Sequence, residues 1–350
     1  MSMSKGDRSV LVTGGHGFLG GHLVDILLER GVRVRCLLRP GRPESVFAGK
    51  PVEICRGDLR RTEGLAEAVS GVDTVFHVAG LIAASGPHGF TDVNVHGTGR
   101  LAAAVAKHNA GCRRFLYISS QTAAGPSPDG RPVTEETAPA PISHYGRSKL
   151  AGERVLPRAL GGVPFTVVRP PAIYGPRDEA LLPFFQCAAL GIAPGLEGQG
   201  RRFNLLHAID VAEGAIAAAE SPDAAGETFF LADETGVGYD DVARALSLAY
   251  GRRTRRVPLP DVLLRFLGAV TDEVARLFGQ TPVFGRQKAI ELSQRWWLCS
   301  ADRARRVFSW EPRIPLARGM LETARWYGET GLVRGGRLSP ANSNLGSGSL

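Results

Sequence analysis

The motif Tyr145-Gly146-Arg147-Ser148-Lys149 places a phenol and an ammonium four residues apart. In a helix, two side chains at this spacing lie on the same face. A phenol has an ordinary pKa of about 10 and is a poor base at neutral pH, but a neighbouring ammonium stabilises the phenolate and lowers that pKa. We therefore expect Tyr145 to act as a general acid and base with the help of Lys149.

A pair of hydroxyls, Ser119-Ser120, follows a short apolar run, residues 115–118, that predicts a strand. Ligands of open α/β sheets bind at the carboxyl ends of the strands, so a serine here is placed to hydrogen-bond a reacting oxygen. Tyr145 follows this strand along the chain, and that context favours a catalytic role over that of a surface aromatic.

A glycine-rich turn, Thr13-Gly14-Gly15-His16-Gly17-Phe18-Leu19-Gly20, lies between the first predicted strand and an amphipathic helix. A dinucleotide pyrophosphate needs backbone N–H groups at close range and a helix N-terminus facing its charge, and glycines permit that approach. The position at the start of a strand-helix-strand series makes the motif informative. We expect Gly14, Gly17, Phe18 and Leu19 to contact the cofactor.

The residues after the second predicted strand favour NADP over NAD. An NAD-binding protein places a carboxylate there, on the ribose 2′-hydroxyl, whereas this chain reads Leu37-Leu38-Arg39-Pro40-Gly41-Arg42. Arg39 and Arg42 could pair with a 2′-phosphate; the alternative is that both are solvated loop arginines. Asp58 and Leu59, after the third predicted strand, are placed to cover the adenine.

Short apolar runs alternate with helical patterns through the first half of the chain. The runs that predict strands are residues 10–12, 32–38, 52–55, 74–78, 115–118 and 165–168. Strands and helices in alternation are typical of a parallel sheet with right-handed crossovers. We predict an α/β fold, a Rossmann doubly wound parallel sheet over residues 1–170, to which residues 203–232 return.

A Pro- and Gly-rich texture after Arg169-Pro170-Pro171 predicts a smaller lobe of mixed structure that binds the substrate, residues 171–202 and 233–330. Its helical patterns lie near residues 240–250, 261–279, 286–298 and 316–328. The Gly/Ser-rich residues 331–350 predict a disordered tail.

The helical pattern at 261–279 carries an apolar stripe, formed by Val262, Leu263, Phe266, Leu267, Val270, Val274, Leu277 and Phe278. Core packing against the sheet is the usual fate of such a stripe, and it is the one we expect. The alternatives are the lining of a substrate pocket and a peripheral contact with a membrane surface.

The composition narrows the classes of protein that this chain can represent. Its 350 residues, 43% hydrophobic and 22% charged, suit one large or two modest domains and exclude collagen-like and coiled-coil classes. The net charge of +8 is scattered in arginine pairs without interleaved aromatics, so we expect no nucleic-acid partner. Five cysteines without a C-x-x-C pair predict no metal site and favour a reduced, cytoplasmic setting. No segment predicts a signal peptide or a membrane span.

Together the motifs resemble those of the extended short-chain dehydrogenase/reductase family, also called the NAD-dependent epimerase/dehydratase family. The matching motifs follow one another in family order, over about residues 9 to 330. They are Thr13-Gly14-Gly15-His16-Gly17-Phe18-Leu19-Gly20, Gly57-Asp58-Leu59, Val75-Phe76-His77-Val78-Ala79-Gly80, Asn94-Val95-His96-Gly97-Thr98, Tyr117-Ile118-Ser119-Ser120, Tyr145-Gly146-Arg147-Ser148-Lys149, Arg169-Pro170-Pro171-Ala172-Ile173-Tyr174-Gly175-Pro176 and His207-Ala208-Ile209-Asp210-Val211-Ala212.

The resemblance implies roles for individual residues. In the family the active Ser or Thr stands five residues before a glycine, and Gly125 therefore selects Ser120 as the third catalytic residue beside Tyr145 and Lys149. The further residues that it assigns to the cofactor site are Ala79 and Gly80 along the cofactor, Asn94 as a brace, Pro170 and Ile173 beside the nicotinamide, and Lys149 at the ribose. It also implies a homodimer formed through two helices that flank the sheet.

Some motif residues of this chain differ from those usual in the family, and these differences indicate the branch of the family that it resembles. Nucleotide-sugar epimerases usually carry Asn where this chain has Ala172, and Arg-Asp where it has Phe203-Asn204. Arg201 and Arg202 are close enough in sequence for a shifted diphosphate contact. Dehydratases place Asp-Glu after the catalytic residue, where this chain has Gln121-Thr122, so elimination is disfavoured.

The motifs are nearest to those of the 3β-hydroxysteroid dehydrogenase and dihydroflavonol reductase-like branch, including a C-terminal Trp310-Glu311-Pro312. We predict an oxidoreductase that prefers NADP and transfers hydride between nicotinamide and a secondary alcohol or ketone carbon of a small, fairly apolar molecule. The alternative is a nucleotide-diphosphate-sugar 4-epimerase with tightly bound NAD. Intact Ser120, Tyr145 and Lys149 argue against a non-catalytic relative.

Overall fold

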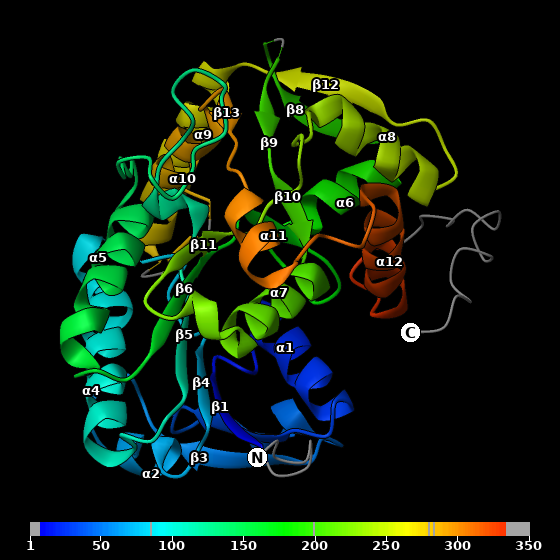
Figure 1. Ribbon diagram of the computed structural model, residues 1–350. Helices are drawn as coiled ribbons and strands as arrows, with labels where there is room; N and C mark the ends of the chain where they lie inside the picture. Colours follow the sequence, from blue (N-terminus) through cyan, green and yellow to red (C-terminus); the bar gives the residue numbers. More distant parts are fainter. Residues whose placement is uncertain (1–7, 85, 199, 279–280, 283, 334–350) are drawn as a thin grey trace.

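A computed structural model describes residues 8–333 of the chain, apart from residues 85, 199, 279–280 and 283. The predicted disordered tail, residues 331–350, lies outside the described residues from residue 334 onward. Figure 1 shows a sheet covered by helices in the lower part of the view and a smaller lobe above it.

Seven parallel strands form the central sheet, in the order β11-β6-β5-β4-β1-β2-β3. They are β1 (Ser9–Thr13), β2 (Arg33–Leu38), β3 (Val52–Arg56), β4 (Thr74–His77), β5 (Arg114–Ile118), β6 (Phe165–Arg169) and β11 (Thr228–Phe230). All six strands predicted in the first half are present, and the predicted fold class is confirmed. The strand order reverses between β1 and β4, and such a switch point is where open α/β sheets bind ligands.

Helices cover both faces of this sheet. One face carries α1 (Phe18–Glu29), α7 (Ala208–Glu220) and α11 (Asp302–Phe308), and the other carries α2 (Leu65–Val69), α4 (Thr98–His108) and α5 (His144–Ala159). Between β4 and α4 lie α3 (Pro87–Phe90) and the π-helical segment Thr91–Gly97. Short 3-10 turns occur at Glu44–Phe47, Gln121–Ala123 and Pro222–Ala224.

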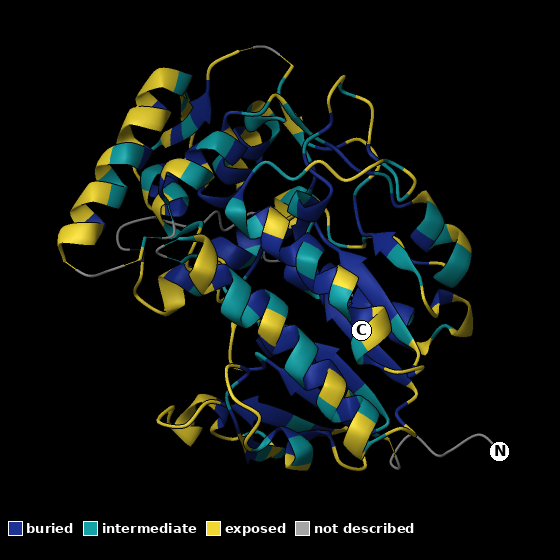
Figure 2. Cartoon of the chain, turned by 90° about the vertical axis from the view of Figure 1, so that its left-hand side faces the viewer, coloured by how far each residue is buried: buried dark blue, intermediate teal, exposed yellow. Residues whose placement is uncertain are grey.

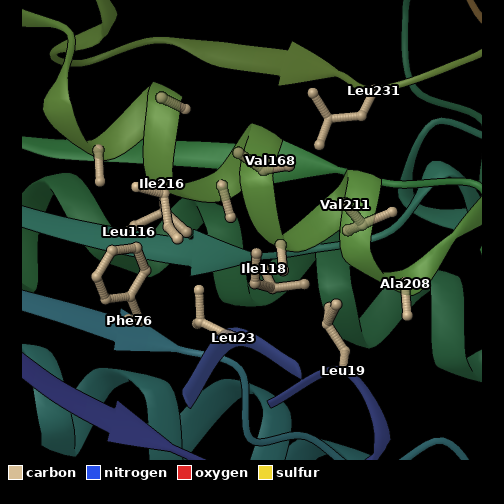
Figure 3. Packing of buried hydrophobic residues seen from close by; sticks show 14 of the residues in the cluster. Leu19, Leu23, Phe76, Leu116, Ile118, Val168, Ala208, Val211, Ile216 and Leu231 are labelled. Carbon is tan, nitrogen blue, oxygen red and sulfur yellow. The ribbon is translucent and has the colours of Figure 1, made fainter. Parts of the chain in front are cut away.

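Strand residues alternate between two hydrophobic cores because successive side chains of a strand point to opposite faces. Val10 and Val12 of β1 pack on the α1 and α7 side, whereas Leu11 packs on the α4 and α5 side. Figure 3 shows the first of these cores, where Leu19 and Leu23 of α1 approach residues of β4, β5, β6 and α7. The strands are accordingly buried on both sides, and they are mostly dark blue in Figure 2.

The smaller lobe combines three two-stranded parallel pairs with five helices in the described part of the chain. The pairs are β7 (Ala172–Tyr174) with β10 (Leu205–His207), β8 (Ile192–Leu196) with β12 (Arg255–Leu259), and β9 (Arg202–Phe203) with β13 (Trp296–Trp297). The helices are α6 (Leu182–Ala189), α8 (Tyr239–Ala249), α9 (Asp261–Leu277), α10 (Arg286–Leu292) and α12 (Leu316–Glu329).

Two predictions for this lobe are wrong. The pattern at 286–298 is not one helix: α10 ends at Leu292, and Trp296 and Trp297 form β13 because they pair with β9. The apolar stripe of α9 is not packed into a core, since all of its members are exposed. No helix in the described ranges combines the length and apolar character needed to cross a bilayer.

Candidate active site

Ser120 lies directly beyond β5, at the carboxyl edge of the sheet. Its Oγ accepts hydrogen bonds from the main-chain N–H of Thr122 at 3.2 Å and from the hydroxyl of Thr122 at 2.9 Å. Ser120 also lies close enough to the phenol of Tyr145 to lower the pKa of that phenol. The structure therefore brings together the serine and tyrosine that the motifs singled out.

Tyr145 lies in the first turn of α5, and Lys149 lies one turn later on the same face. The helix begins where Ser143 accepts a hydrogen bond from the N–H of Gly146 at 3.0 Å, which is a standard N-cap arrangement. A Cβ on Gly146 would lie 2.3 Å from the carbonyl oxygen of Thr122. Glycine at this position therefore lets α5 approach the loop that carries Ser120.

Lys149 is buried beside the end of β5, with only 3% of its surface exposed. Its Nζ donates a hydrogen bond to the carbonyl oxygen of Ile118 at 2.6 Å and lies 4.2 Å from the centre of the Tyr117 ring. Burial lowers the pKa of Lys149 to about 7, while the carboxylate of Glu153 acts in the opposite direction. A lysine with a pKa of about 7 gains and loses its proton near neutral pH.

The pKa of Tyr145 differs from the expectation drawn from the motif. Loss of hydration, and to a smaller extent the negative charge of Glu291, raise the pKa of Tyr145 to about 12, although the neighbouring Ser120 acts in the opposite direction. The polypeptide alone therefore keeps the phenol protonated, because the Lys149 ammonium is directed at a carbonyl and a ring. In this form Tyr145 is a proton donor at neutral pH.

A buried ion pair lies behind the serine pair. Arg169, at the end of β6, donates hydrogen bonds from Nε at 2.9 Å and from Nη2 at 2.6 Å to the carboxylate of Glu153 on α5. The hydroxyl of Ser119 also donates to Glu153. The Ser119 hydroxyl therefore has a structural role, as a hydrogen-bond donor to Glu153. The sequence reasoning missed Glu153, although its spacing of four residues from Lys149 puts it on the same helix face.

Asn94 connects the loop after β4 to the helix that carries Tyr145. Its Nδ2 donates to the carbonyl of Leu81 at 3.0 Å and to Oγ of Ser148 at 2.9 Å, and its Oδ1 accepts from the N–H of Leu81 at 2.8 Å. It lies in the π-helical segment, a feature frequent at functional sites. A Cβ on Gly80 would lie 3.2 Å from Asn94 Oδ1 and 3.6 Å from Lys149 Nζ. Gly80 and Lys149 are therefore neighbours.

The glycine-rich turn packs closely against the strand on the other side of the switch point. Gly14 has φ +73°, and a Cβ there would lie 2.9 Å from the backbone of Ala79. A Cβ on Gly20 would lie 2.1 Å from the carbonyl oxygen of Gly14. Gly17 is the N-cap of α1 and has no side chain to occupy the first N–H groups. This helix end therefore suits an anionic group.

Arg39 and Arg42 both lie near this turn. Their positive charges lower the pKa of His16, after the larger effect of burial. Both arginines are exposed, and neither has an ion-pair partner in the described part of the chain. Arg56 donates hydrogen bonds to both of their carbonyl oxygens, which fixes the loop. Two guanidinium groups beside a helix N-terminus suit a dinucleotide with an added phosphate.

The other residues predicted to bind the cofactor lie near the glycine-rich turn or near Ser120. Phe18 and Leu19 open α1, and Leu59 is buried against Gly97. Asp58 is partly exposed and accepts a hydrogen bond from the N–H of Arg60 at 3.0 Å. Pro170 accepts one from the N–H of Gln121, next to Ser120, at 2.8 Å, and Ile173 follows in β7.

The smaller lobe touches the catalytic helix through α10, which the sequence reasoning did not anticipate. Glu291 is buried and accepts a hydrogen bond from Ser143 Oγ at 2.5 Å. Gln287 Oε1 accepts one from the N–H of His144 at 2.9 Å. Both contacts are made to the first residues of α5. The two lobes therefore jointly fix the helix end from which Tyr145 projects.

Comparisons with known proteins identify a family and individual relatives. The model of the NAD dependent epimerase/dehydratase family matches residues 10–232. The chain is 34% identical over 327 residues to a ceramide reductase of Caulobacter vibrioides, with 92% of this chain and 95% of that protein covered. It is 29% identical to a 3 beta-hydroxysteroid dehydrogenase/Delta 5-->4-isomerase of Mycobacterium tuberculosis, with 91% and 90% covered.

Among solved structures, the UDP-glucose 4-epimerase of Thermotoga maritima superimposes with a TM-score of 0.75 at 21% identity. The match covers 92% of this chain and 99% of that one. At this identity the likeness concerns the fold alone.

Proposed function

The chain belongs to the NAD-dependent epimerase/dehydratase family and is an oxidoreductase acting on CH–OH groups. We propose that it uses NADPH to reduce a ketone of a small, apolar molecule to a secondary alcohol. The observation that carries this proposal is the placement of Tyr145 and the buried Lys149 one turn apart on α5, beside Ser120 at the end of β5. The names of the two relatives, a ceramide reductase and a hydroxysteroid dehydrogenase, support an apolar substrate.

In the proposed reaction, the substrate carbonyl oxygen lies between Ser120 and Tyr145. When bound, a reduced nicotinamide would supply the hydride that the carbonyl carbon receives. Ser120 donates a hydrogen bond to the oxygen as negative charge develops on it. Tyr145 transfers its phenolic proton to the same oxygen, which completes the alcohol. Lys149 would hold the cofactor ribose, and its charged form would stabilise the phenolate that remains.

We test this reaction with purified protein, NADPH and a panel of steroid and long-chain ketones. The loss of NADPH absorbance and the alcohol formed are measured together, and we expect one alcohol for each NADPH consumed. Tyr145→Phe should lower kcat by about 10²- to 10⁴-fold, the range for loss of a general acid. Tyr327→Phe, in α12, provides a buried-tyrosine control. Equal activity of Tyr145→Phe and wild type would refute the proposal.

For the cofactor we propose NADP, on the strength of Arg39 and Arg42 beside the glycine-rich turn. NADPH should bind at least about tenfold more tightly than NADH, or about 1.4 kcal/mol. Arg39→Asp should abolish this preference, whereas Arg325→Asp, an exposed change on α12, should preserve it. Equal binding of both dinucleotides by the wild type would contradict the proposed preference for NADP.

The epimerase alternative needs cationic side chains for a diphosphate. Arg201 donates to Asp261 at 2.6 Å and to the carbonyl of Ser293 at 2.8 Å, and Arg202 donates to the carbonyl of Gly236 at 2.8 Å. Because both guanidinium groups already have protein partners, neither suits a shifted diphosphate contact. We retain the reductase as the proposed function.

We further propose that the protein is a homodimer, formed through two helices that flank the sheet as the family resemblance implies, and that it acts in the cytoplasm. The cysteines support a reducing setting, since all five are free thiols. Sedimentation equilibrium tests the dimer, which should have twice the chain mass of 37.3 kDa.

A further inference from the structure

His77, the last residue of β4, lies at the switch point of the sheet and has no role in the proposed reaction. Its side chain is completely buried, and the imidazole has a partner at each of its two nitrogens. Nδ1 lies 2.7 Å from Oγ1 of Thr13, and Nε2 lies 2.9 Å from Oγ1 of Thr98. Thr13 is the first residue of the glycine-rich turn, and Thr98 begins α4. The ring therefore joins the glycine-rich turn to the start of α4.

The hydrogen bonds around this imidazole have one consistent direction. The hydroxyl of Thr98 donates its single proton to the carbonyl oxygen of Asn94 at 2.9 Å, so it accepts from Nε2–H of His77. A neutral imidazole protonated on Nε2 has Nδ1 as an acceptor, and Thr13 therefore donates to Nδ1. Oγ1 of Thr13 in turn accepts from the main-chain N–H of Ala79 at 3.2 Å. The neighbours thus determine which nitrogen of His77 carries the proton.

Beyond Thr98, the same chain of hydrogen bonds reaches the helix that carries Tyr145. Asn94 donates from Nδ2 to Oγ of Ser148 at 2.9 Å. The hydroxyl of Ser148 donates to the carbonyl oxygen of Tyr145 at 2.7 Å. The chain thus runs from the glycine-rich turn at the end of β1, through β4 and the π-helical segment, to the first turns of α5.

The ring of His77 also lies beside the aromatic ring that contacts Lys149. The ring centres of His77 and Tyr117 are 5.4 Å apart, with 28° between their planes. Nζ of Lys149 lies 4.2 Å from the centre of the Tyr117 ring. Burial, and to a smaller extent the positive charge of Lys149, lower the pKa of His77 to about 3. The imidazole is therefore neutral at physiological pH, as the directions of its hydrogen bonds require.

We propose that His77 is a positioning residue, which holds the glycine-rich turn and the helix of Tyr145 in a fixed relation through this chain of hydrogen bonds. A buried polar network in which every group has a partner makes the segments that it joins rigid. Breaking the chain at Thr98, away from the turn, should therefore weaken the binding of a dinucleotide at the turn. The benefit for Tyr145 rests on the proposed function, whereas dinucleotide binding is measured without a ketone.

The first test uses Thr98→Val in the full chain, since valine has a similar shape but no hydroxyl. The matched control is Thr323→Val in α12, because Thr323 is equally buried and its hydroxyl donates to the carbonyl oxygen four residues earlier, that of Gly319, at 2.7 Å. Each variant is titrated with NADPH and NADH and followed by fluorescence. For the dinucleotide that binds more tightly, Thr98→Val should raise the dissociation constant about three- to tenfold, within the range of effects transmitted through a network, and the control should not change it. Equal dissociation constants for the two variants would overturn the inference.

A double variant tests whether Thr98 acts through His77. His77→Asn keeps an acceptor for Thr13, because the amide oxygen of asparagine occupies the same point of the side chain as Nδ1, but it has no group that reaches Thr98. In this background, Thr98→Val should raise the dissociation constant no further, since the bond that it breaks is already absent. Additive effects of the two substitutions would overturn the inference.

The tautomer of His77 is measured on the wild type, by nitrogen NMR of protein labelled in histidine, and the signal is assigned by its absence in His77→Asn. We expect a neutral ring with its proton on Nε2 at neutral pH. A proton on Nδ1, or a charged ring, would reverse or break the chain and would overturn the inference. A wild type that binds a dinucleotide but reduces no ketone would refute the proposed function, while the binding tests would still decide the role of His77. Failure of the wild type to bind either dinucleotide would overturn both.

Discussion

The hydroxyls of Ser119 and Ser120 are adjacent in the sequence but have different partners. Ser119 donates to the buried carboxylate of Glu153, whereas Ser120 accepts from Thr122 and lowers the pKa of the Tyr145 phenol. Ser120→Ala should therefore lower kcat by about 10²-fold, the usual effect of losing one donor to a developing oxyanion. Ser119→Ala should leave kcat near the wild-type value and lower the free energy of unfolding by about 1–3 kcal/mol. Steady-state kinetics and urea unfolding of both variants check this, and a larger kcat loss in Ser119→Ala would reverse the assignment.

Lys149 gives the protein a stability that depends on pH. Its pKa falls from an ordinary 10.5 to about 7 in the folded state. Between these values the unfolded chain holds a proton that the folded protein has lost, so stability increases as pH rises from about 7 towards 10. Between about pH 7 and pH 9, the free energy of unfolding of the wild type should rise by on the order of 1–2 kcal/mol relative to that of Lys149→Met. Urea unfolding at both pH values measures the difference. No change in the gap between wild type and variant would contradict the lowered pKa.

At the scale of elements, the approach of α5 to the loop after β5 decides whether Tyr145 reaches Ser120. Gly146 permits this approach, since a Cβ there would lie 2.3 Å from the carbonyl oxygen of Thr122. Gly146→Ala should lower kcat and cost about 1–3 kcal/mol of stability through overpacking. Gly328→Ala in α12, where nothing lies within 4 Å, should instead stabilise by up to about 1 kcal/mol. Equal kcat values for the two variants would show that the close approach is unimportant for catalysis.

The sequence predicted helices and strands whose pattern lies within a few consecutive residues. It could not predict which other segments pack on these elements. Strand alternation and the glycine-rich turn identified the sheet because each signal lies within a few residues. The stripe of α9 showed that one helix face is apolar, but the same pattern fits a core helix and an exposed one. Trp296 and Trp297 continued a helical pattern, yet they form β13 because β9, far away in the sequence, offers a partner.

At the scale of the whole molecule, the two lobes meet at the catalytic helix. Glu291 and Gln287 of the smaller lobe bond to Ser143 and His144, and Glu291 also raises the pKa of Tyr145. The structure places Tyr145 and Lys149 on α5, near Ser120 at the end of β5. The motifs carried no signal for Glu291, because its contact with α5 spans 148 residues and depends on how the lobes assemble.

The central claim is net hydride transfer to a ketone that Tyr145 then protonates. The most direct measurement uses NADPH deuterated at the nicotinamide, an apolar ketone accepted in the panel assay, and mass spectrometry of the product. We predict an alcohol that carries one deuterium, formed in equal amount to the NADP released. Purified protein that retains NAD through dialysis, oxidises no added NADPH and returns an epimerised sugar nucleotide would contradict the account.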